Sequence, residues 1–389
     1  MSMLTEIRAV TAMNLAALPQ RLGASLVIVI GMTCVVAVFI STLSMSAGFM
    51  KAIGNTGSET RAMVLTQGAT YEGQGALERS VAAAVEDAPG VARTPQGKPI
   101  ASAELVTQFP VTKKGGDFFT FATLRGIGPE GFALRPNMKI VEGRMFKPAV
   151  HEMIVGTSAQ AMFKGVEIGD KIEMPEGDWT VVGSFTSDDD IHQSELLADA
   201  DTAMSSFRKN VYSSVTVQLT GDSAYDEFKA ALTTNPAISV DVQREPEYYA
   251  MLAEDLNVIL KIIAYWIGGI MAIGAIFGAL NTMYAAVSTR SVEIATLRAI
   301  GFGPTGVVIS VLAEALLLAS VGAVLGGAIA WMAFNGNQQG AGTVVFKLAV
   351  TPWMLFGGIG VAALVGFFGG LFPAIRAARL PITVALQVR

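Results

Sequence analysis

Side chains that could carry out chemistry are few in this chain of 389 residues. It has two histidines and one cysteine, Cys34, which excludes an internal disulfide and a cysteine-based zinc site. The sequence has no G-x-x-x-x-G-K-[ST] phosphate loop, no G-x-S-x-G elbow and no H-E-x-x-H motif. We therefore predict that the chain is not an enzyme, that it cannot hydrolyse ATP alone, and that it holds no metal or cofactor.

The best candidate for a metal site is an acidic segment that contains Asp188, Asp189, Asp190 and His192. Carboxylate oxygens suit a hard cation, but no Gly or terminal Glu completes a calcium loop. We interpret the segment as a solvated acidic loop.

Glu314 is the one ionisable residue well inside an apolar stretch. A charge at mid-bilayer costs at least ~2.5 kcal/mol, so we expect Glu314 near the inner boundary, facing another helix and close to Arg298 or Arg8. A packing or coupling role is favoured because the apolar stretches offer no further titratable group. A proton relay is the alternative.

The segment from Ser288 to Pro304 is short and charged between two apolar stretches. It predicts a helix that ends at Gly301. Apolar residues form one face and charged residues flank it: Val292, Ala295, Ala299 and Ile300, with Arg290, Glu293 and Arg298. Such a helix is suited to dock into a soluble motor, and periodicity alone equally allows a passive helix at the membrane surface.

The elements that position these residues are mostly membrane helices, since 52% of the chain is apolar and only 15% is charged. Four stretches exceed the roughly 20 residues that cross a bilayer. We assign transmembrane helices to 22–50, to the second part of 246–288, to 305–331 and to 352–375.

Basic residues near the span ends indicate the orientation. Arg8 and Arg21, Arg290 and Arg298, and Arg376, Arg379 and Arg389 share one side, whereas only Lys347 marks the other short loop. This places both termini, the loop 289–304 and the tail 376–389 in the cytoplasm. The acidic segment 51–245 and the short loop 332–351 are then periplasmic, in a bacterial inner membrane. Residues 1–21 predict an amphipathic helix on the inner headgroups, with a frayed terminus as the alternative.

The exterior segment predicts a mixed α/β domain with two subdomains that divide near 125–143. We expect helices and strands in the following places: a helix at 75–86, a hairpin of 100–111 with 118–126, strands at 153–155, 171–174, 180–185 and 214–219, and helices at 158–163 and 225–233.

The stretch 245–288 predicts one long helix that continues outward from the second span as a stalk. Its coiled-coil spacing marks four packing residues: Leu252, Leu256, Ile259 and Ile263. Its expected partner is the outer end of the first span, and a break at Lys261 is the alternative.

Glycines four residues apart in the spans predict close helix packing, within one chain or between two chains. They form three pairs: Gly274 with Gly278, Gly322 with Gly326, and Gly366 with Gly370.

The inner loop resembles the R-x-x-E-I-x-x-L-R-A-x-G region of MacB and FtsX type ABC transporter permeases, also called type VII or mechanotransmission permeases. The matching residues are Arg290, Glu293, Ile294, Leu297, Arg298, Ala299 and Gly301. The end of the fourth span, 370–386, is similar to the C-terminal pattern of that family. In the exterior, 142–146, 154–156, 168–170 and 179–185 resemble a MacB-like periplasmic core domain.

This resemblance implies a permease that pairs with a second protomer, identical or related, and with two copies of a separate ABC ATPase that binds ATP and Mg. The inner loop would be the coupling helix, and membrane lipid and a periplasmic adaptor protein would be further partners. Nucleic acid is excluded by the charge.

The function expected from the resemblance is export or extraction of amphipathic cargo, such as a lipoprotein, glycolipid, peptide or hydrophobic drug. The alternative is an FtsX-like relay that regulates a periplasmic cell-wall hydrolase without transport.

Overall fold

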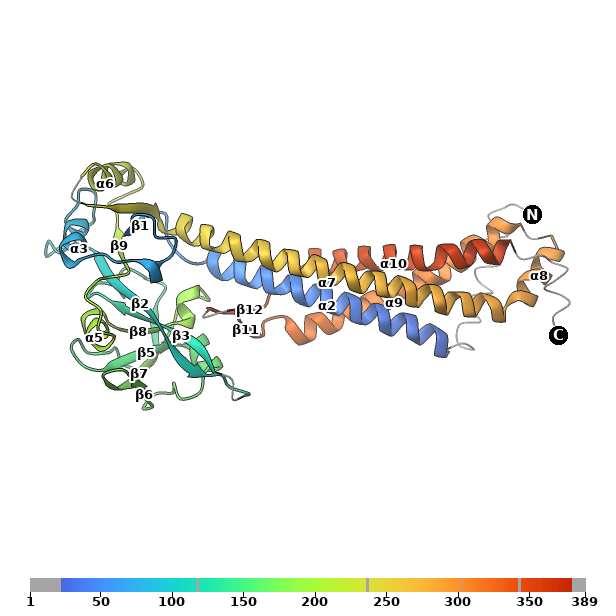
Figure 1. The fold of residues 1–389 in the computed structure, drawn as a ribbon, viewed down its shortest axis with the longest axis horizontal. Helices are drawn as coiled ribbons and strands as arrows, with labels where there is room; N and C mark the ends of the chain where they lie inside the picture. The colour runs from blue at the N-terminus through green and yellow to red at the C-terminus, as the bar shows by residue number, and fades with distance from the viewer. Residues whose placement is uncertain (1–21, 117–118, 236–237, 302, 342–343, 380–389) are drawn as a thin grey trace. The chain divides into compact units, whose positions relative to one another are not determined.

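The computed structural model describes residues 22–116, 119–235, 238–301, 303–341 and 344–379 (Figure 1). The predicted surface helix at 1–21 lies outside these residues, as does the end of the C-terminal tail. The chain forms two compact units. We call the one that contains Gly48–Asn257 and Gly336–Leu348 the α/β unit, and the one that contains Val258–Asn335 the membrane unit.

Four helices are long and apolar enough to cross a membrane: α2 (Leu22–Gly54), α7 (Glu245–Thr289), α9 (Pro304–Phe334) and α10 (Pro352–Ala378). A short helix, α8 (Ser291–Ala299), follows α7. Pro304 and Pro352 begin α9 and α10, where a missing backbone N–H costs no helical hydrogen bond. The predicted number and order of apolar helices are thus confirmed within the described residues.

Two of the three predicted glycine pairs lie where helices of this chain touch. A Cβ atom on Gly322 would come within 2.8 Å of the Val29 carbonyl oxygen, and one on Gly326 within 2.6 Å of the Thr33 carbonyl oxygen, both in α2. On α10, Cβ atoms at Gly366 and Gly370 would crowd α9 in the same way. Because these glycines have no side chain, α9 packs directly against the backbone of α2.

The third pair behaves differently. Gly274 and Gly278 in α7 face open space, since a Cβ atom added to either would meet no atom of the described residues within 4 Å. This pair makes no close helix contact inside the described part of the chain.

Helix α7 is continuous over 45 residues, so the alternative of a break at Lys261 is wrong. The predicted packing residues, however, do not form its seam within this chain. Ile259 and Ile263 are 52% and 43% exposed, whereas Ala264 is fully buried with Met32 and Val36 of α2. Small residues allow a closer approach to α2 than the branched isoleucines would. Leu252 is half-buried, and the side chain of Leu256 lies outside the described residues.

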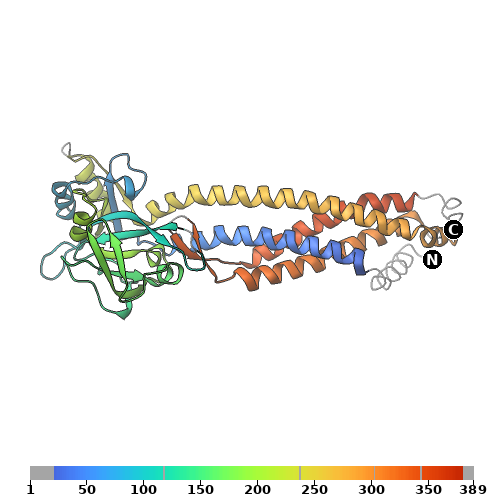
Figure 2. The same ribbon diagram turned by 60° about the horizontal axis from the view of Figure 1, so that its bottom comes forward.

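The α/β unit is built on a mixed sheet of ten strands. The strand order is β10-β1-β9-β2-β3-β8-β5-β7-β4, with β6 paired to β7. The strands are β1 (Arg61–Thr66), β2 (Ala101–Thr112), β3 (Phe119–Ile127), β4 (Lys139–Gly143), β5 (Glu152–Gly156), β6 (Lys171–Met174), β7 (Gly177–Thr186), β8 (Leu196–Asp199), β9 (Ser214–Gln218) and β10 (Val240–Arg244). Strands β8, β5 and β7, drawn in green, lie side by side in Figure 2.

Strand β2 joins the part of the sheet that contains β10, β1 and β9 to the part that begins with β3. Its first residues, Ala101–Glu104, pair with β9, and the residues from Leu105 onward pair with β3. One sheet therefore runs through the region near 125–143 where we expected a division.

Helices and short 3-10 turns cover this sheet: η2 (Glu72–Gln74), α3 (Arg79–Glu86), α4 (Thr157–Met162), η3 (Ile191–Ser194), α5 (Ala200–Ser206) and α6 (Ala224–Thr233). Helix α6 lies beside β10, and α3 lies beside β9 (Figure 1). The helix predicted at 75–86 begins four residues late, because the backbone of Leu77 pairs with that of Tyr212 instead. A hairpin of β11 (Gln338–Ala341) and β12 (Val344–Lys347) completes the unit.

Candidate functional site

The inner loop forms a sharp turn followed by a short helix. Arg290 leaves helical geometry, with φ −103° and ψ 8°, and so separates α7 from α8. Gly301 ends α8 with a positive φ of 106°, a conformation that favours glycine. The turn and the cap set α8 between α7 and α9, and the predicted stop at Gly301 is confirmed.

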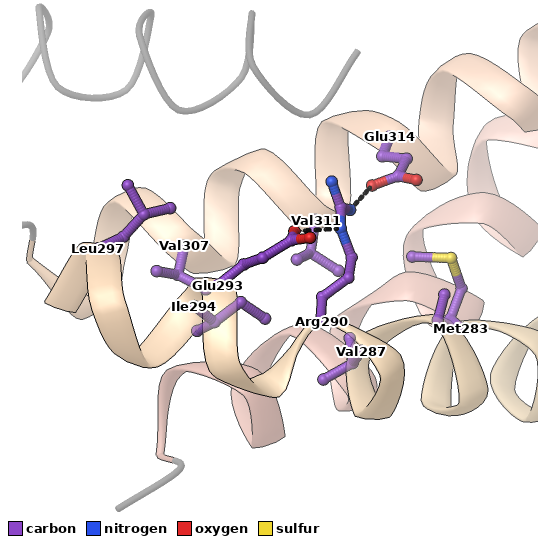
Figure 3. A pocket seen from close by; sticks show the side chains of 10 residues that line it. Met283, Val287, Arg290, Glu293, Ile294, Leu297, Val307, Val311 and Glu314 are labelled. Carbon is purple, nitrogen blue, oxygen red and sulfur yellow. Dashed lines mark hydrogen bonds and ion pairs between the residues drawn. The ribbon is translucent and has the colours of Figure 1, made fainter. Parts of the chain in front are cut away.

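Arg290 ties the three helices together through its guanidinium group. Its Nη1 donates a hydrogen bond to the Glu314 carboxylate of α9 at 2.9 Å, and its Nε lies 3.6 Å from the Glu293 carboxylate of α8 (Figure 3). Glu314 thus pairs with Arg290, where we expected Arg298 or Arg8, and Arg8 lies outside the described residues. The sequence spacing along a helix could not predict this partner, because the turn at Arg290 places its side chain against α9.

Both members of this ion pair are buried, at 5% exposure each, in a pocket with mostly apolar walls. The walls are formed by Met283, Ala286, Val287, Ile294, Leu297, Val307 and Val311. A buried charge without a partner is expensive, whereas a hydrogen-bonded pair offsets most of its desolvation cost. The pair thus fixes α8 against α9 in one geometry.

Some side chains of the inner loop face the pocket around the ion pair, and others are exposed. Ile294 is buried and Leu297 lines the pocket, whereas Val292 and Ile300 are 44% and 71% exposed. Our predicted apolar face is therefore only partly right, since Ala295 is buried in the chain. The face that a partner protein could reach includes Val292 and Ile300. Arg298 is half-buried.

A second constellation of charges lies inside the α/β unit. The Arg125 guanidinium donates to the carboxylates of Glu72, Glu104 and Glu195 at 2.7–3.0 Å, and Arg135 donates to Glu104 at 2.7 Å. All five side chains are buried. Burial alone would raise the pKa of the Glu104 carboxyl, but Arg135 and Arg125 outweigh it and hold the pKa at about 2.

The first turn of α7 is anchored beside this cluster. The Glu245 carboxylate accepts hydrogen bonds from Arg61 and from the backbone N–H of Ser58. The Tyr248 hydroxyl accepts from the backbone N–H of Glu72 at 3.0 Å, and the Tyr249 hydroxyl lies 3.4 Å from His192 Nε2. The N-terminal end of α7 is therefore held in the α/β unit by buried hydrogen bonds as well as by apolar packing.

The acidic segment is not the solvated loop that we predicted. Asp190 and His192 are buried, at 3% and 1% exposure, while Asp188 and Asp189 remain exposed. Asp190 accepts from Asn137 and caps η3 through the His192 backbone N–H, and the His192 ring contacts Glu195 at 2.9 Å. Among the described residues, no group of three or more His, Cys, Asp or Glu side chains could hold a metal ion.

Sequence reasoning missed the buried arginines and glutamates because they come from strands, a short turn and loops between residues 72 and 195 that only the fold brings together. One signal was present. Arg125 and Glu104 each interrupt an apolar strand at an inward-facing position, where a charge needs a partner.

The fold and the inner loop together define an α-helical membrane protein with a large mixed α/β domain between its first and second apolar helices. Residues 22–235 match the MacB-like periplasmic core domain, and residues 265–382 match the FtsX-like permease C-terminal domain. The chain therefore belongs to the MacB/FtsX family of ABC transporter permeases, as its motifs predicted.

Three relatives illustrate the range of this family. The lipoprotein-releasing system transmembrane protein LolC of Xylella fastidiosa is 24% identical over 93% of both chains. The ABC transporter permease YknZ of Bacillus subtilis is 26% identical over 69% of this chain and 70% of its own. The macrolide export ATP-binding/permease protein MacB of Rhodopirellula baltica is 28% identical over 34% of this chain and 20% of its own.

Proposed function

We propose that this permease couples ATP hydrolysis by a separate ABC ATPase to a conformational change of its periplasmic domain. The observation that carries the proposal is the Arg290 link, which joins α8 to α9 at the foot of the uninterrupted helix α7. A force applied to α8 cannot be absorbed by a loose loop, because the buried pair holds the loop against the bundle. The same helix α7 is anchored at its other end by Glu245 in the α/β unit.

The exposed residues Val292 and Ile300 form the surface on which we place the ATPase. An exposed apolar patch with Glu293 and Arg298 at its rim is typical of a protein–protein contact, because apolar side chains are more stable when a partner covers them than when they are in water. Two ATPase copies and a second permease protomer would complete the complex, with ATP and Mg bound by the ATPase. We place it in a bacterial inner membrane with both termini in the cytoplasm and the α/β domain in the periplasm.

Amphipathic cargo is the substrate class that we favour, and a lipoprotein is its first example. Support comes from similarity to LolC over nearly the full length of both chains. A periplasmic adaptor protein would fit this function. The second candidate is an FtsX-like relay that controls a cell-wall hydrolase, and it is supported by the match of residues 265–382 to the FtsX-like domain.

The experiment purifies the permease with its ATPase from native membranes into nanodiscs and measures MgATP hydrolysis. We expect Ile300→Asp, Arg298→Glu or Glu293→Lys to lower hydrolysis at least about tenfold or to uncouple it, since a disrupted anchor costs about 1–2 kcal/mol or more. Phe356→Leu on the exposed face of α10 is the control and should hydrolyse ATP normally.

Unchanged assembly and hydrolysis in all three loop variants would exclude the docking role. Mass spectrometry of molecules that copurify separates the two candidates, because a lipoprotein or lipid supports export and a peptidoglycan hydrolase supports the relay.

A further inference from the structure

The hairpin β11–β12 connects α9 to α10 in sequence, yet it is part of the α/β unit. Val345 is 2% exposed and belongs to the main hydrophobic core of that unit. Phe346 is 3% exposed, and its ring packs edge-on against Phe49 with the centroids 5.5 Å apart. The hairpin is therefore bound to the domain, and it is more than a short connection between two spans.

The approach of the hairpin to the last turns of α2 is close. A Cβ atom on Gly48 would lie 2.3 Å from the Lys347 carbonyl oxygen, and real Cβ atoms do not come so near to another atom. Only glycine at position 48 allows the backbone of β12 to lie where it does.

Lys347 extends the contact to the acidic segment. Its Nζ donates to both carboxylate oxygens of Asp189, at 2.7 and 3.0 Å. Asp188 and Asp189 adopt positive φ values of 50° and 60°, which few residues other than Gly, Asn and Asp tolerate. Gln193 holds this backbone in place, because its side chain accepts from the Asp189 N–H and donates to the Asp189 carboxylate.

The segment Ser187–Ser194 also contacts the chain just after α2 and the first turns of α7. The backbone N–H of Ile191 donates to the Thr56 hydroxyl just after α2, at 3.2 Å. The His192 ring contacts Tyr249 in the first turns of α7 both edge-on and through its Nε2 atom. Three stretches of chain that lead to the membrane helices thus meet at this one segment of the α/β unit.

We propose that the β11–β12 hairpin is a strap that couples α9 and α10 to the periplasmic domain through the contact of Lys347 with Asp189. Segment Ser187–Ser194 is then a junction that combines the movements of α2, of α7 and of the α9–α10 pair. The functional part of this inference rests on the proposed function, since it assumes that ATP hydrolysis moves the membrane helices. The contact between Lys347 and Asp189 does not depend on that assumption.

The first test uses the full chain in nanodiscs without the ATPase and follows amide hydrogen exchange by mass spectrometry. Lys347→Met and Asp189→Asn each remove one charge, and asparagine keeps the preference for positive φ. We expect exchange in 187–194 to rise about two- to fivefold in either variant, as loss of a partly exposed ion pair allows. The double variant should add little to either single variant.

Two further variants complete this test. Gly48→Leu should raise exchange in β12 itself, because the hairpin must move away from α2. Lys139→Met, on the exposed edge strand β4, is the control and should leave 187–194 unchanged. Unchanged exchange in 187–194 for Lys347→Met, Asp189→Asn and Gly48→Leu would overturn the strap.

The second test adds the ATPase and compares the nucleotide-free complex with the vanadate-trapped complex. We expect a nucleotide-dependent change of exchange in 187–194 in the wild type that falls at least about twofold in Lys347→Met, while ATP hydrolysis stays normal. An equal nucleotide response in both proteins would refute the coupling role. If the wild type binds no ATPase, the proposed function fails, and the first test still decides the strap contact.

Discussion

Arg290 connects two helices of the inner loop region, because its one guanidinium group contacts the Glu293 carboxylate of α8 and the Glu314 carboxylate of α9. Arg290 lies directly after α7 and immediately before α8, so we expect a rotation of α8 to break the ion pair with Glu314 or to move α9 as well. A buried pair of this kind contributes little net stability, but the loss of one partner leaves a charge without compensation.

We predict that Glu314→Ala destabilises the membrane unit by about 3–5 kcal/mol, since it leaves the Arg290 charge buried without this carboxylate. The double variant Arg290→Met/Glu314→Leu should recover most of this loss and still fail to couple ATP hydrolysis to function. Thermal unfolding in nanodiscs measures the first effect, and assays of the complex measure the second. Equal unfolding temperatures for wild type and Glu314→Ala would contradict the assigned pair.

The charges around Arg125 predict how the α/β unit responds to acid. The folded pKa of Glu104, about 2, lies below the ordinary glutamate value of about 4.3. Its contribution to stability is therefore complete above about pH 4.3 and is lost as the pH falls toward about 2. Burial would raise the pKa of Glu195 as well, but Arg125 and His192 outweigh it and lower that pKa in the same direction.

We expect the unit to stay folded at about pH 4.5 and to open progressively below it. Pepsin, which is active over this range, should begin to cleave β2 and β3 only below about pH 4. In Glu104→Gln, which leaves Arg135 without its carboxylate partner, cleavage should occur already at about pH 4.5. Identical cleavage profiles for the two proteins would rule out a stabilising role for the Glu104 contacts.

Helix packing explains why the membrane unit depends on particular glycines. Gly326 in α9 faces the backbone of α2, whereas Gly274 in α7 faces open space among the described residues. The two residues sit in similar small-residue patterns, so their different surroundings give a matched comparison.

We predict that Gly326→Leu separates α9 from α2 and costs about 1–3 kcal/mol or more, because an added side chain meets backbone that cannot rotate away. Gly274→Leu should leave the unfolding temperature of the isolated chain unchanged. Thermal unfolding in nanodiscs compares the two variants. A larger loss in Gly274→Leu than in Gly326→Leu would contradict the close contact of α9 with the backbone of α2.

The whole molecule has an internal asymmetry of charge that agrees with two different environments. Residues 51–255 contain 18 basic and 29 acidic side chains, whereas the remaining residues contain 9 and 3. The candidate spans lie mostly in the second group, where basic residues near their ends predict the orientation.

We predict that a membrane-impermeant maleimide added to intact spheroplasts labels Phe119→Cys and does not label Ile300→Cys. Both positions are well exposed, at 82% and 71%, and the background variant Cys34→Ser removes the one native thiol. Ile300→Cys should react only after the membrane is permeabilised. The reverse pattern would invert the proposed topology.

Hydropathy and residue-type patterns that extend over many neighbouring residues determined most helices and the longest hairpin of this protein. Four charge-poor stretches, the 45-residue helix α7 and the hairpin of β2 with β3 follow from hydropathy, from the near absence of interior Pro and from β-rich composition, which act over neighbouring residues. The motif Arg290–Gly301 likewise identified the family before any contact was known. Strands β1, β4, β8 and β10 were not predicted, because a strand takes much of its stability from its neighbours, and their neighbours in the sheet are distant in the chain.

Only the tertiary structure decided which partners these elements have. Arg290 rather than the expected Arg298 pairs with Glu314, Ala264 rather than Ile263 is buried in the core of the helix bundle, and Asp190 is buried although its neighbours Asp188 and Asp189 are exposed. The physical reason is the same in each case. Burial and pairing depend on the angle at which one element meets another, and that angle is set by contacts between residues far apart in sequence.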